Sequence, residues 1–157
     1  MPGLQSFKTF TPTINEAVKN KKPANHANFD KKILVIGYGS VGQAVVPLLL
    51  KHIVNDPKQI TIIEKDDHGK IYRKRHGGSG VKYVKKEILK NNLNSVLKQH
   101  TEAGGFIVDV SLNIAAHAII EWCLQNDVMY INTSHERWGD MQDEKIPKME
   151  ERTLFHT

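Results

Sequence analysis

The sequence predicts an α/β fold of the Rossmann-like type, in which a doubly wound parallel sheet carries helices on both faces. Short β-branched runs alternate with segments of helical periodicity over residues 32–131, and this alternation is typical of parallel sheets. The first run leads into a GxGxxG motif at Gly37–Gly42, and the second ends at an acidic residue, Glu64. Together these features predict a domain that binds a dinucleotide.

Length and composition indicate one domain. The 157 residues are 39% hydrophobic and 25% charged, as in ordinary globular proteins. No apolar run approaches the roughly 18 residues of a membrane helix, and the first residues lack the features of a secretory signal. The single cysteine, Cys123, excludes an internal disulfide and agrees with a reducing compartment. We therefore expect a cytoplasmic protein that does not bind membranes.

The formal net charge of +5 invites a nucleic-acid interpretation. The basic residues are dispersed over 19–22, 70–75 and 82–90, with few aromatic residues among them. This distribution favours a solvated basic surface, and we expect no nucleic-acid partner.

Residues 1–30 are expected to form an N-terminal arm that precedes a nucleotide-binding domain at residues 31–157. The arm contains three prolines and a polar, mostly basic stretch. Within it, Thr13 and Glu16 have the spacing of a capping box, which would begin a short helix.

Residues 32–36 are the first expected strand, buried on both faces because it has no polar alternation. The glycines of the following motif permit a tight turn, a close approach of pyrophosphate and close packing of the next helix. That helix is expected over residues 40–52, and Pro47 within it should kink or shorten it. The predicted phosphate-binding residues are Gly37, Tyr38, Gly39, Ser40, Val41 and Gly42.

The second strand is expected at residues 59–63 and is followed by Glu64, which lies 22 positions beyond Gly42. An acidic residue about 20 positions after the motif commonly binds the ribose 2′-hydroxyl and repels a 2′-phosphate. We therefore predict NAD as the cofactor. Lys65 could neutralise a 2′-phosphate, so NADP stays open as the alternative.

The next segment, residues 66–80, leaves room for a short helix at most. His68 and His76 have no partners at zinc-ligand spacing, so we interpret them as exposed loop residues and predict no metal site. A third strand is expected at residues 81–84 and a helix at residues 93–100.

A fourth strand is expected at residues 106–110, a helix at 114–125 and a fifth strand at 128–131. Cys123 falls on the apolar face of that helix and is interpreted as a core residue, while Asp109 is interpreted as a loop or helix cap. Ligands of open parallel sheets bind beyond the carboxyl ends of the strands, so the segments that follow strands four and five should face the cofactor. The last residues, 146–157, read as helical without a stop signal, so we expect the N-terminal part of a longer chain.

Four segments resemble the nucleotide-binding half of bacterial homospermidine synthases, in the wider saccharopine-dehydrogenase-like group. They are ILVIGYGSVG at 33–42, QAVVPLL at 43–49, VDVSLN at 108–113 and YINTSHERW at 130–138. The last two are more specific than the glycine motif, which many dehydrogenases share.

This resemblance implies a homodimeric enzyme that makes homospermidine from putrescine. Bound NAD would oxidise putrescine to an imine, an amine would be exchanged, and NADH would return the hydride. The resemblance implies that Glu64 binds the adenosine ribose; Lys65 beside it is a further expected cofactor-binding residue. The resemblance also implies that the diamine is bound by Glu136 and Trp138, through charge attraction and cation–π contact. It assigns no catalytic residue to this segment. On the nicotinamide side it places Val110, Ser111, Asn113 and Thr133.

Several alternatives stay open. Arg137 stands where relatives commonly have proline, and Glu136 and Trp138 could be a surface carboxylate and a cover for the sheet edge. A saccharopine or carboxynorspermidine dehydrogenase would need an arginine for a substrate carboxylate, and none is assignable. A regulatory nucleotide-binding module would suit the length of the chain.

Overall fold

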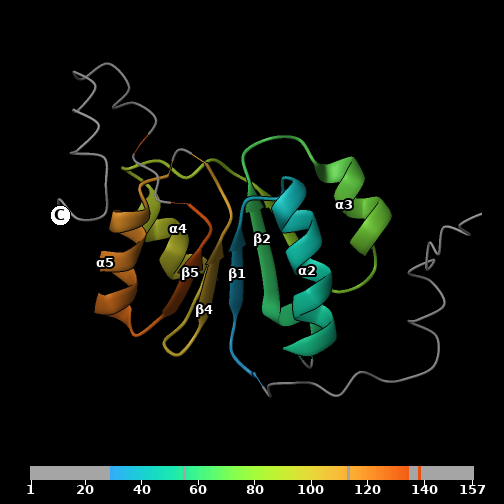
Figure 1. The fold of residues 1–157 in the computed structure, drawn as a ribbon, viewed down its shortest axis with the longest axis horizontal. Coiled ribbons are helices and arrows are strands. Elements are labelled where there is room, and N and C mark those ends of the chain that lie inside the picture. The colour runs from blue at the N-terminus through green and yellow to red at the C-terminus, as the bar shows by residue number, and fades with distance from the viewer. Residues whose placement is uncertain (1–28, 55, 113, 135–137, 139–157) are drawn as a thin grey trace, which may run out of the picture.

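The computed structural model describes residues 29–54, 56–112, 114–134 and 138. Within them, five parallel strands form one sheet in the order β3-β2-β1-β4-β5 (Figure 1). The chain runs from β1 outward to β3, returns to the centre and runs outward again through β4 and β5, which confirms the predicted doubly wound sheet. The strands are β1 (Ile33–Ile36), β2 (Ile60–Glu64), β3 (Lys82–Lys85), β4 (Phe106–Asp109) and β5 (Met129–Asn132).

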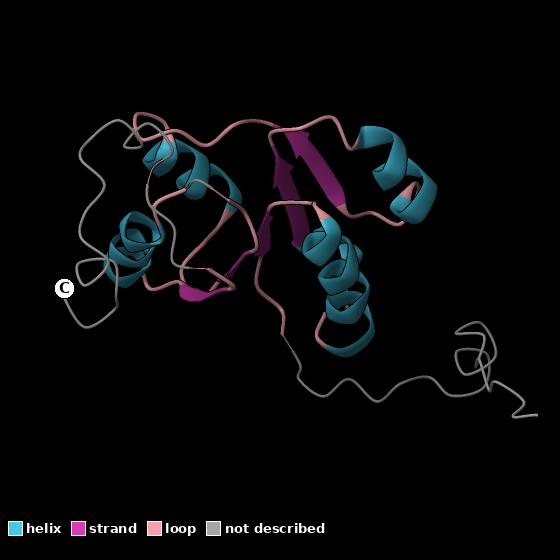
Figure 2. Cartoon of the chain, turned by 45° about the horizontal axis from the view of Figure 1, so that its top comes forward, coloured by secondary structure: helices cyan, strands magenta, loops and turns pink. Residues whose placement is uncertain are grey.

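Helices cover both faces of this sheet (Figure 2). They are α2 (Ser40–His52), the 3-10 turn η1 (Pro57–Gln59), α3 (Gly69–His76), α4 (Leu93–His100) and α5 (Ala116–Asn126). None of the helices in the described parts of the chain is long and apolar enough to cross a membrane.

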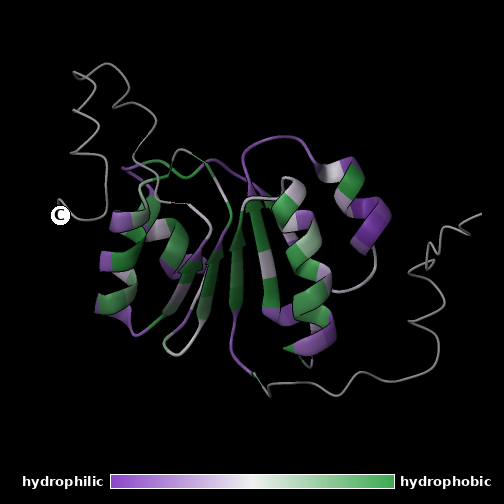
Figure 3. Ribbon diagram, viewed as in Figure 1, coloured by the Kyte–Doolittle hydropathy of each residue, from purple (hydrophilic) through white to green (hydrophobic). Residues whose placement is uncertain are grey.

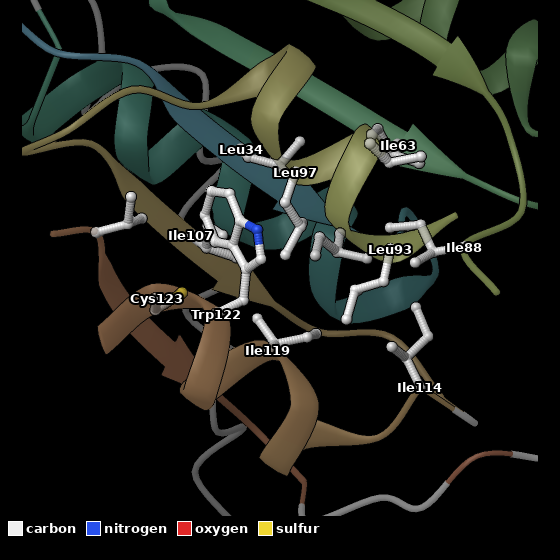
Figure 4. Close-up of a cluster of buried hydrophobic side chains, with 13 residues drawn as sticks. Leu34, Ile63, Ile88, Leu93, Leu97, Ile107, Ile114, Ile119, Trp122 and Cys123 are labelled. Carbon is white, nitrogen blue, oxygen red and sulfur yellow. The ribbon is translucent and has the colours of Figure 1, made fainter. Parts of the chain in front are cut away.

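Alternate residues of the central strands supply two hydrophobic cores. Ile33 and Val35 point to the side of α2, whereas Leu34 and Ile36 point to the side of α4 and α5. On the second side, Leu93 and Leu97 pack with Trp122 and the other residues drawn in Figure 4. All four residues of β1 are buried because neighbouring strands flank it and helices cover both faces. Each such side chain contributes about 1.5–3 kcal/mol by leaving water.

Pro47 does not shorten α2, contrary to one of the two predicted effects. The helix runs over all 13 residues from Ser40 to His52. Proline has no N–H to donate to the carbonyl of Gln43, four residues earlier. The guanidinium of Arg75 in α3 donates to that carbonyl oxygen at 3.5 Å. The Gln43 carbonyl, which Pro47 leaves without a donor in α2, therefore accepts a hydrogen bond from α3 instead.

The two histidines predicted as exposed loop residues are both placed differently. His68 is half-buried and directly precedes α3, and His76 lies in the last turn of α3 and is buried. The His76 ring packs near Tyr38 and Tyr72, at centroid distances of 6.1 and 6.0 Å. Although this segment reads as basic and polar, it contributes Tyr72 and His76 to an aromatic cluster on the α2 side of the sheet.

Some predicted features lie outside the described residues. These are nearly all of the N-terminal arm, the C-terminal helix from residue 146, and two proposed ligand-binding residues, Asn113 and Glu136.

Candidate functional site

A cavity of about 810 Å³ lies at the carboxyl edge of the sheet. Its walls come from the ends of β1, β2 and β4 and from the segment after β3, residues 86–91. This is the edge at which open parallel sheets bind ligands. The strand order reverses between β1 and β4, so the loops after these two strands separate and leave room for a ligand.

Two glycines of the predicted phosphate turn are required by the fold itself. Gly37 has φ of +95°, and a Cβ there would come within 2.9 Å of both the Ser111 nitrogen and the Val110 carbonyl oxygen. A Cβ on Gly42 would lie 2.3 Å from the carbonyl oxygen of Gly37. These positions exclude any side chain because the turn, the helix and the loop after β4 meet there.

Gly39 differs from these two glycines, because nothing in the fold requires it. Its φ of −68° suits any residue, and a Cβ there would meet no atom within 4 Å. Gly39 lines the cavity and caps α2, whose first turn has neither a side-chain cap nor an acidic residue. The free N–H groups of a helix start favour an anion. The open space at Gly39 therefore fits the pyrophosphate of a dinucleotide.

Glu64 braces the turn as well as lining the cavity. The residue is 7% exposed, and its side-chain Oε2 accepts a hydrogen bond from the Tyr38 backbone N–H at 2.5 Å. Oε1 accepts from the Asp66 N–H at 2.9 Å, and His68 Nδ1 lies 3.7 Å from Oε2. The carboxylate thus fixes the predicted phosphate turn against the end of β2, a contact that the motif spacing did not predict.

Asp109 acts at the end of β4 as the predicted loop cap. It is buried, and its Oδ1 accepts from the backbone N–H and the hydroxyl of Ser111 at 3.0 and 2.6 Å. Tyr130 of β5 donates to Oδ2 at 3.0 Å. Burial, and then the Asp109 carboxylate, raise the pKa of the Tyr130 phenol, so it remains a donor. This network holds Ser111 at the cavity wall.

The cavity brings together seven of the predicted binding residues and leaves others outside its wall. Thr133 donates its N–H to the Asp109 carbonyl, and Tyr38 is buried beneath the turn among aromatic rings. Of the other predicted residues that are described, Ser40, Val41 and Gly42 belong to α2 and do not line the cavity. The seven are Gly37, Gly39, Glu64, Lys65, Val110, Ser111 and Trp138.

One side of the cavity, formed by the segment after β3, was not predicted from the sequence. Lys86, Ile88 and Asn91 lie there, facing the turn across the ends of β1 and β2. The sequence does contain a signal for this side of the cavity, because a segment that directly follows a parallel strand lies at the same edge of the sheet as the turn after the first strand. Charges of both signs occur along this wall, including Lys86, Glu87 and Lys90.

Cys123 is a core residue, as predicted. Burial raises the pKa of its thiol to about 11, so the thiolate that a nucleophile needs is scarce at neutral pH. It packs in the core on the α4–α5 side. Among the residues that the structure describes, no three potential metal-binding side chains gather into a site.

Comparisons with known proteins agree on one group. Residues 33–155 match the family model described as the saccharopine dehydrogenase NADP binding domain. Similar proteins include homospermidine synthases from Blastochloris viridis, 29% identical over 119 residues, and from Mesorhizobium japonicum, 28% identical over 109 residues. These alignments cover 74% and 68% of this chain and 24% and 22% of the relatives.

A solved structure is also similar. It is the homospermidine synthase from Legionella pneumophila in complex with NAD, with a TM-score of 0.66 and 28% identity. The match covers 78% of this chain and 25% of that one. The chain therefore spans about a quarter of the length of the relatives it matches.

Proposed function

Because the chain belongs to the family of saccharopine dehydrogenase NADP-binding domains, we propose that it is the nucleotide-binding part of a homospermidine synthase and that its nucleotide is NAD. Three similar proteins support this proposal, since all are homospermidine synthases and the solved one holds NAD.

The observation that carries the proposal is the open space at Gly39. A glycine that the fold does not need stands at an uncapped helix start and faces the cavity. In this arrangement the pyrophosphate lies against the first turn of α2, where the helix dipole favours negative charge. A side chain at this position would occupy the space of the phosphates.

Glu64 supports NAD rather than NADP, although the family description names NADP. Its carboxylate lines the cavity at the end of β2, where the adenosine ribose lies in this fold. Hydrogen bonds from the backbone N–H groups of Tyr38 and Asp66 hold the carboxylate in place at the cavity. A ribose hydroxyl can donate to the carboxylate, whereas a 2′-phosphate would be repelled.

The nicotinamide end is proposed to lie beside the loops after β4 and β5. Val110 and Ser111 line the cavity there, and Trp138 lines it from beyond β5. Asn113 and Glu136 fall outside the described residues, so their roles rest on the resemblance alone. The Trp138 ring offers a cationic amine a cation–π contact.

When bound, NAD accepts a hydride from an amine-bearing carbon and later returns it, so that two putrescine molecules yield homospermidine and ammonia without net oxidation. The residues of this chain bind and orient the nucleotide for that cycle. Asp109 and Tyr130 position Ser111, and Glu64 positions the phosphate turn.

The cofactor proposal is tested by the ratio of NAD to NADP affinity, measured by calorimetric titration. Glu64→Ala should weaken NAD binding more than NADP binding, because the ribose loses its acceptor while the 2′-phosphate loses a repulsive charge. Loss of the brace on Tyr38 weakens both nucleotides alike, so the ratio isolates the ribose contact.

Glu102→Ala is the matched control, because Glu102 pairs with Lys32 at the opposite edge of the sheet and does not line the cavity. It removes the same charge and should leave the ratio unchanged. An unchanged ratio in Glu64→Ala would overturn the ribose assignment.

The reaction is tested on the full-length protein. With putrescine and catalytic NAD, homospermidine and ammonia should form without accumulation of NADH. Stoichiometric NADH production from an amino-acid substrate would favour a saccharopine-type dehydrogenase instead. Nucleotide binding without turnover of either substrate would favour a regulatory module.

A further inference from the structure

Four of the large exposed hydrophobic side chains gather on one side of the domain. Two of them, Met129 and Ile131, belong to the edge strand β5. They are in register with Phe106 and Val108 of β4, whose side chains pack on the α2 side of the sheet. Residues paired across parallel strands point to the same face. Met129 and Ile131 therefore point toward the α2 side.

The other two, Val41 and Leu48, lie on α2. Together with half-buried Val45 they form a stripe at i, i+4 and i+7, on one flank of the helix. The other flank carries Gln43, whose carbonyl contacts Arg75 of α3. Figure 1 shows α3 on the side of α2 that is away from β4 and β5. The apolar stripe lies on the opposite flank of α2 and is therefore turned toward β4 and β5. We call Val41, Val45, Leu48, Phe106, Met129 and Ile131 the α2–β5 face.

Topology explains why this face is uncovered. Right-handed crossovers place α2 and α3 on one side of β1–β3, and place α4 and α5 on the other side of the sheet. Within the described residues, α2 packs against Val108 of β4, but no helix covers β5 on this side. Figure 3 shows the hydrophobic colouring along α2 and the strands beside it. The four exposed side chains of the α2–β5 face are 49–56% exposed, and large apolar side chains gathered on one face mark a contact surface.

We propose that the N-terminal arm of the same chain, residues 4–18, packs on the α2–β5 face. Phe29, the first residue that the structure describes, lies beside Phe106 of this face. The ring of Phe29 packs edge-on against Phe106, with centroids 6.4 Å apart and planes at 69°. Phe29 is also bridged to Val54 after α2, and its carbonyl accepts from Gln59 Nε2 at 2.9 Å. The arm thus joins the described part of the chain next to Phe106, which is a member of the face.

The arm has side chains that suit this surface. Ile14, Ala17 and Val18 follow the capping-box residue Thr13 at the spacing of one helical face, and Leu4, Phe7 and Phe10 precede them. The ten polar or small residues 19–28 can extend to about 33 Å. The 13 residues of α2 measure about 20 Å, so the apolar part of the arm can reach the whole face.

The C-terminal segment is a poorer occupant. Trp138, the last described residue, packs against the core formed by α4 and α5. Trp138 therefore lies on the side of the sheet opposite the α2–β5 face.

Engineered cysteine pairs in the full chain test the proposal. Val18→Cys with Leu48→Cys should form an intramolecular disulfide under mild oxidation, mapped by peptide mass spectrometry. The native Cys123 is buried and should stay reduced. Val18→Cys with Glu121→Cys is the control, since Glu121 is exposed on α5, on the other side of the sheet. Equal cross-linking of both pairs, or a disulfide formed only between two chains, would overturn the proposal.

Thiol labelling gives a second readout that does not depend on disulfide geometry. Leu48→Cys should react with a maleimide several-fold faster when Ile14→Asp and Val18→Asp are added, because the charged arm leaves the face. The same additions should not change the labelling rate of Glu121→Cys. An unchanged rate at Leu48→Cys would show that the arm does not cover it.

Discussion

Gly39 and Gly42 stand three residues apart in one motif, yet they serve different interactions. Gly42 is needed by the protein, because its Cα hydrogen faces the carbonyl oxygen of Gly37 at the crossing of the turn and α2. The space beside Gly39 is empty of protein, so we propose that this glycine is needed by the nucleotide and not by the fold. Substitution can therefore separate folding from binding within a single motif.

We expect Gly39→Ala to weaken NAD binding by roughly tenfold or more, equal to about 1.4 kcal/mol. Its cost in the free energy of unfolding should be at most about 1 kcal/mol, because alanine is only a poorer N-cap than glycine. Gly42→Ala should destabilise the fold by about 1–3 kcal/mol through overpacking. Urea unfolding and calorimetric titration of both variants measure the two effects.

The pair serves as its own control. If Gly39→Ala bound NAD as tightly as the parent protein, the phosphate could not lie at the start of α2. If Gly42→Ala were as stable as the parent, the turn would have to differ from the close packing described here.

The two buried carboxylates at strand ends also differ from each other in the loops that they contact. Glu64 and Asp109 both accept hydrogen bonds from the loops that follow their own strands. Glu64 also reaches across to the loop after β1. Motif spacing marks Glu64 as a ligand for ribose but gives no sign of this bracing, which depends on the adjacency of β1 and β2.

At the scale of elements, α2 continues through Pro47 and is tied to α3 at the carbonyl that the proline leaves free. Proline in a helix interior usually costs up to about 3 kcal/mol relative to alanine. The exposed Arg75 contact at 3.5 Å is long, so it offsets only part of this cost.

Pro47→Ala should therefore raise the free energy of unfolding by about 1–3 kcal/mol, because the alanine N–H can donate to Gln43. Thermal or urea unfolding measures the change. Lys51→Ala, at another exposed position of α2, is the control and should stay within about 0.5 kcal/mol. A less stable Pro47→Ala variant would mean that the proline is required for the packing of α2 and α3.

At the scale of the whole molecule, two buried histidines make stability depend on pH. Burial, and then the charge of Arg75, lower the pKa of His76 below its ordinary value of 6.5. Burial, and then the neighbouring lysines, lower the pKa of His100. Below about pH 6.5 the unfolded chain binds protons at these positions while the folded chain does not. Stability is therefore present above this pH and is lost as the pH falls below it.

The urea midpoint should drop between about pH 8 and about pH 5.5, and the drop should be smaller when His76→Gln and His100→Gln are combined. His117→Gln is the control, because His117 is exposed and pairs only with Glu121 in the described structure. A drop of equal size in the double variant would assign the pH dependence to other groups.

The sequence predicted much of this fold because its signals are local. Short β-branched runs marked five strands, helical periodicity marked the main helices, and α2 and α4 have the predicted bounds. His76 was misjudged because a basic, glycine-rich segment resembles a loop. Its burial comes from Tyr38, which is distant in sequence, and from Tyr72, which lies one turn earlier in α3.

What the sequence by itself determined is the order of strands and helices along the chain, the glycine turn before α2 and the acidic end of β2, since each depends on neighbours along the chain. Only the tertiary structure decided that Gly39 faces open space, that Glu64 braces Tyr38 and that residues 86–91 close the cavity. It also decided that Val41, Leu48, Met129 and Ile131 share one exposed face. These properties arise where parallel strands bring loops that are distant in sequence to a common edge of the sheet. A local sequence pattern does not show which loops meet there.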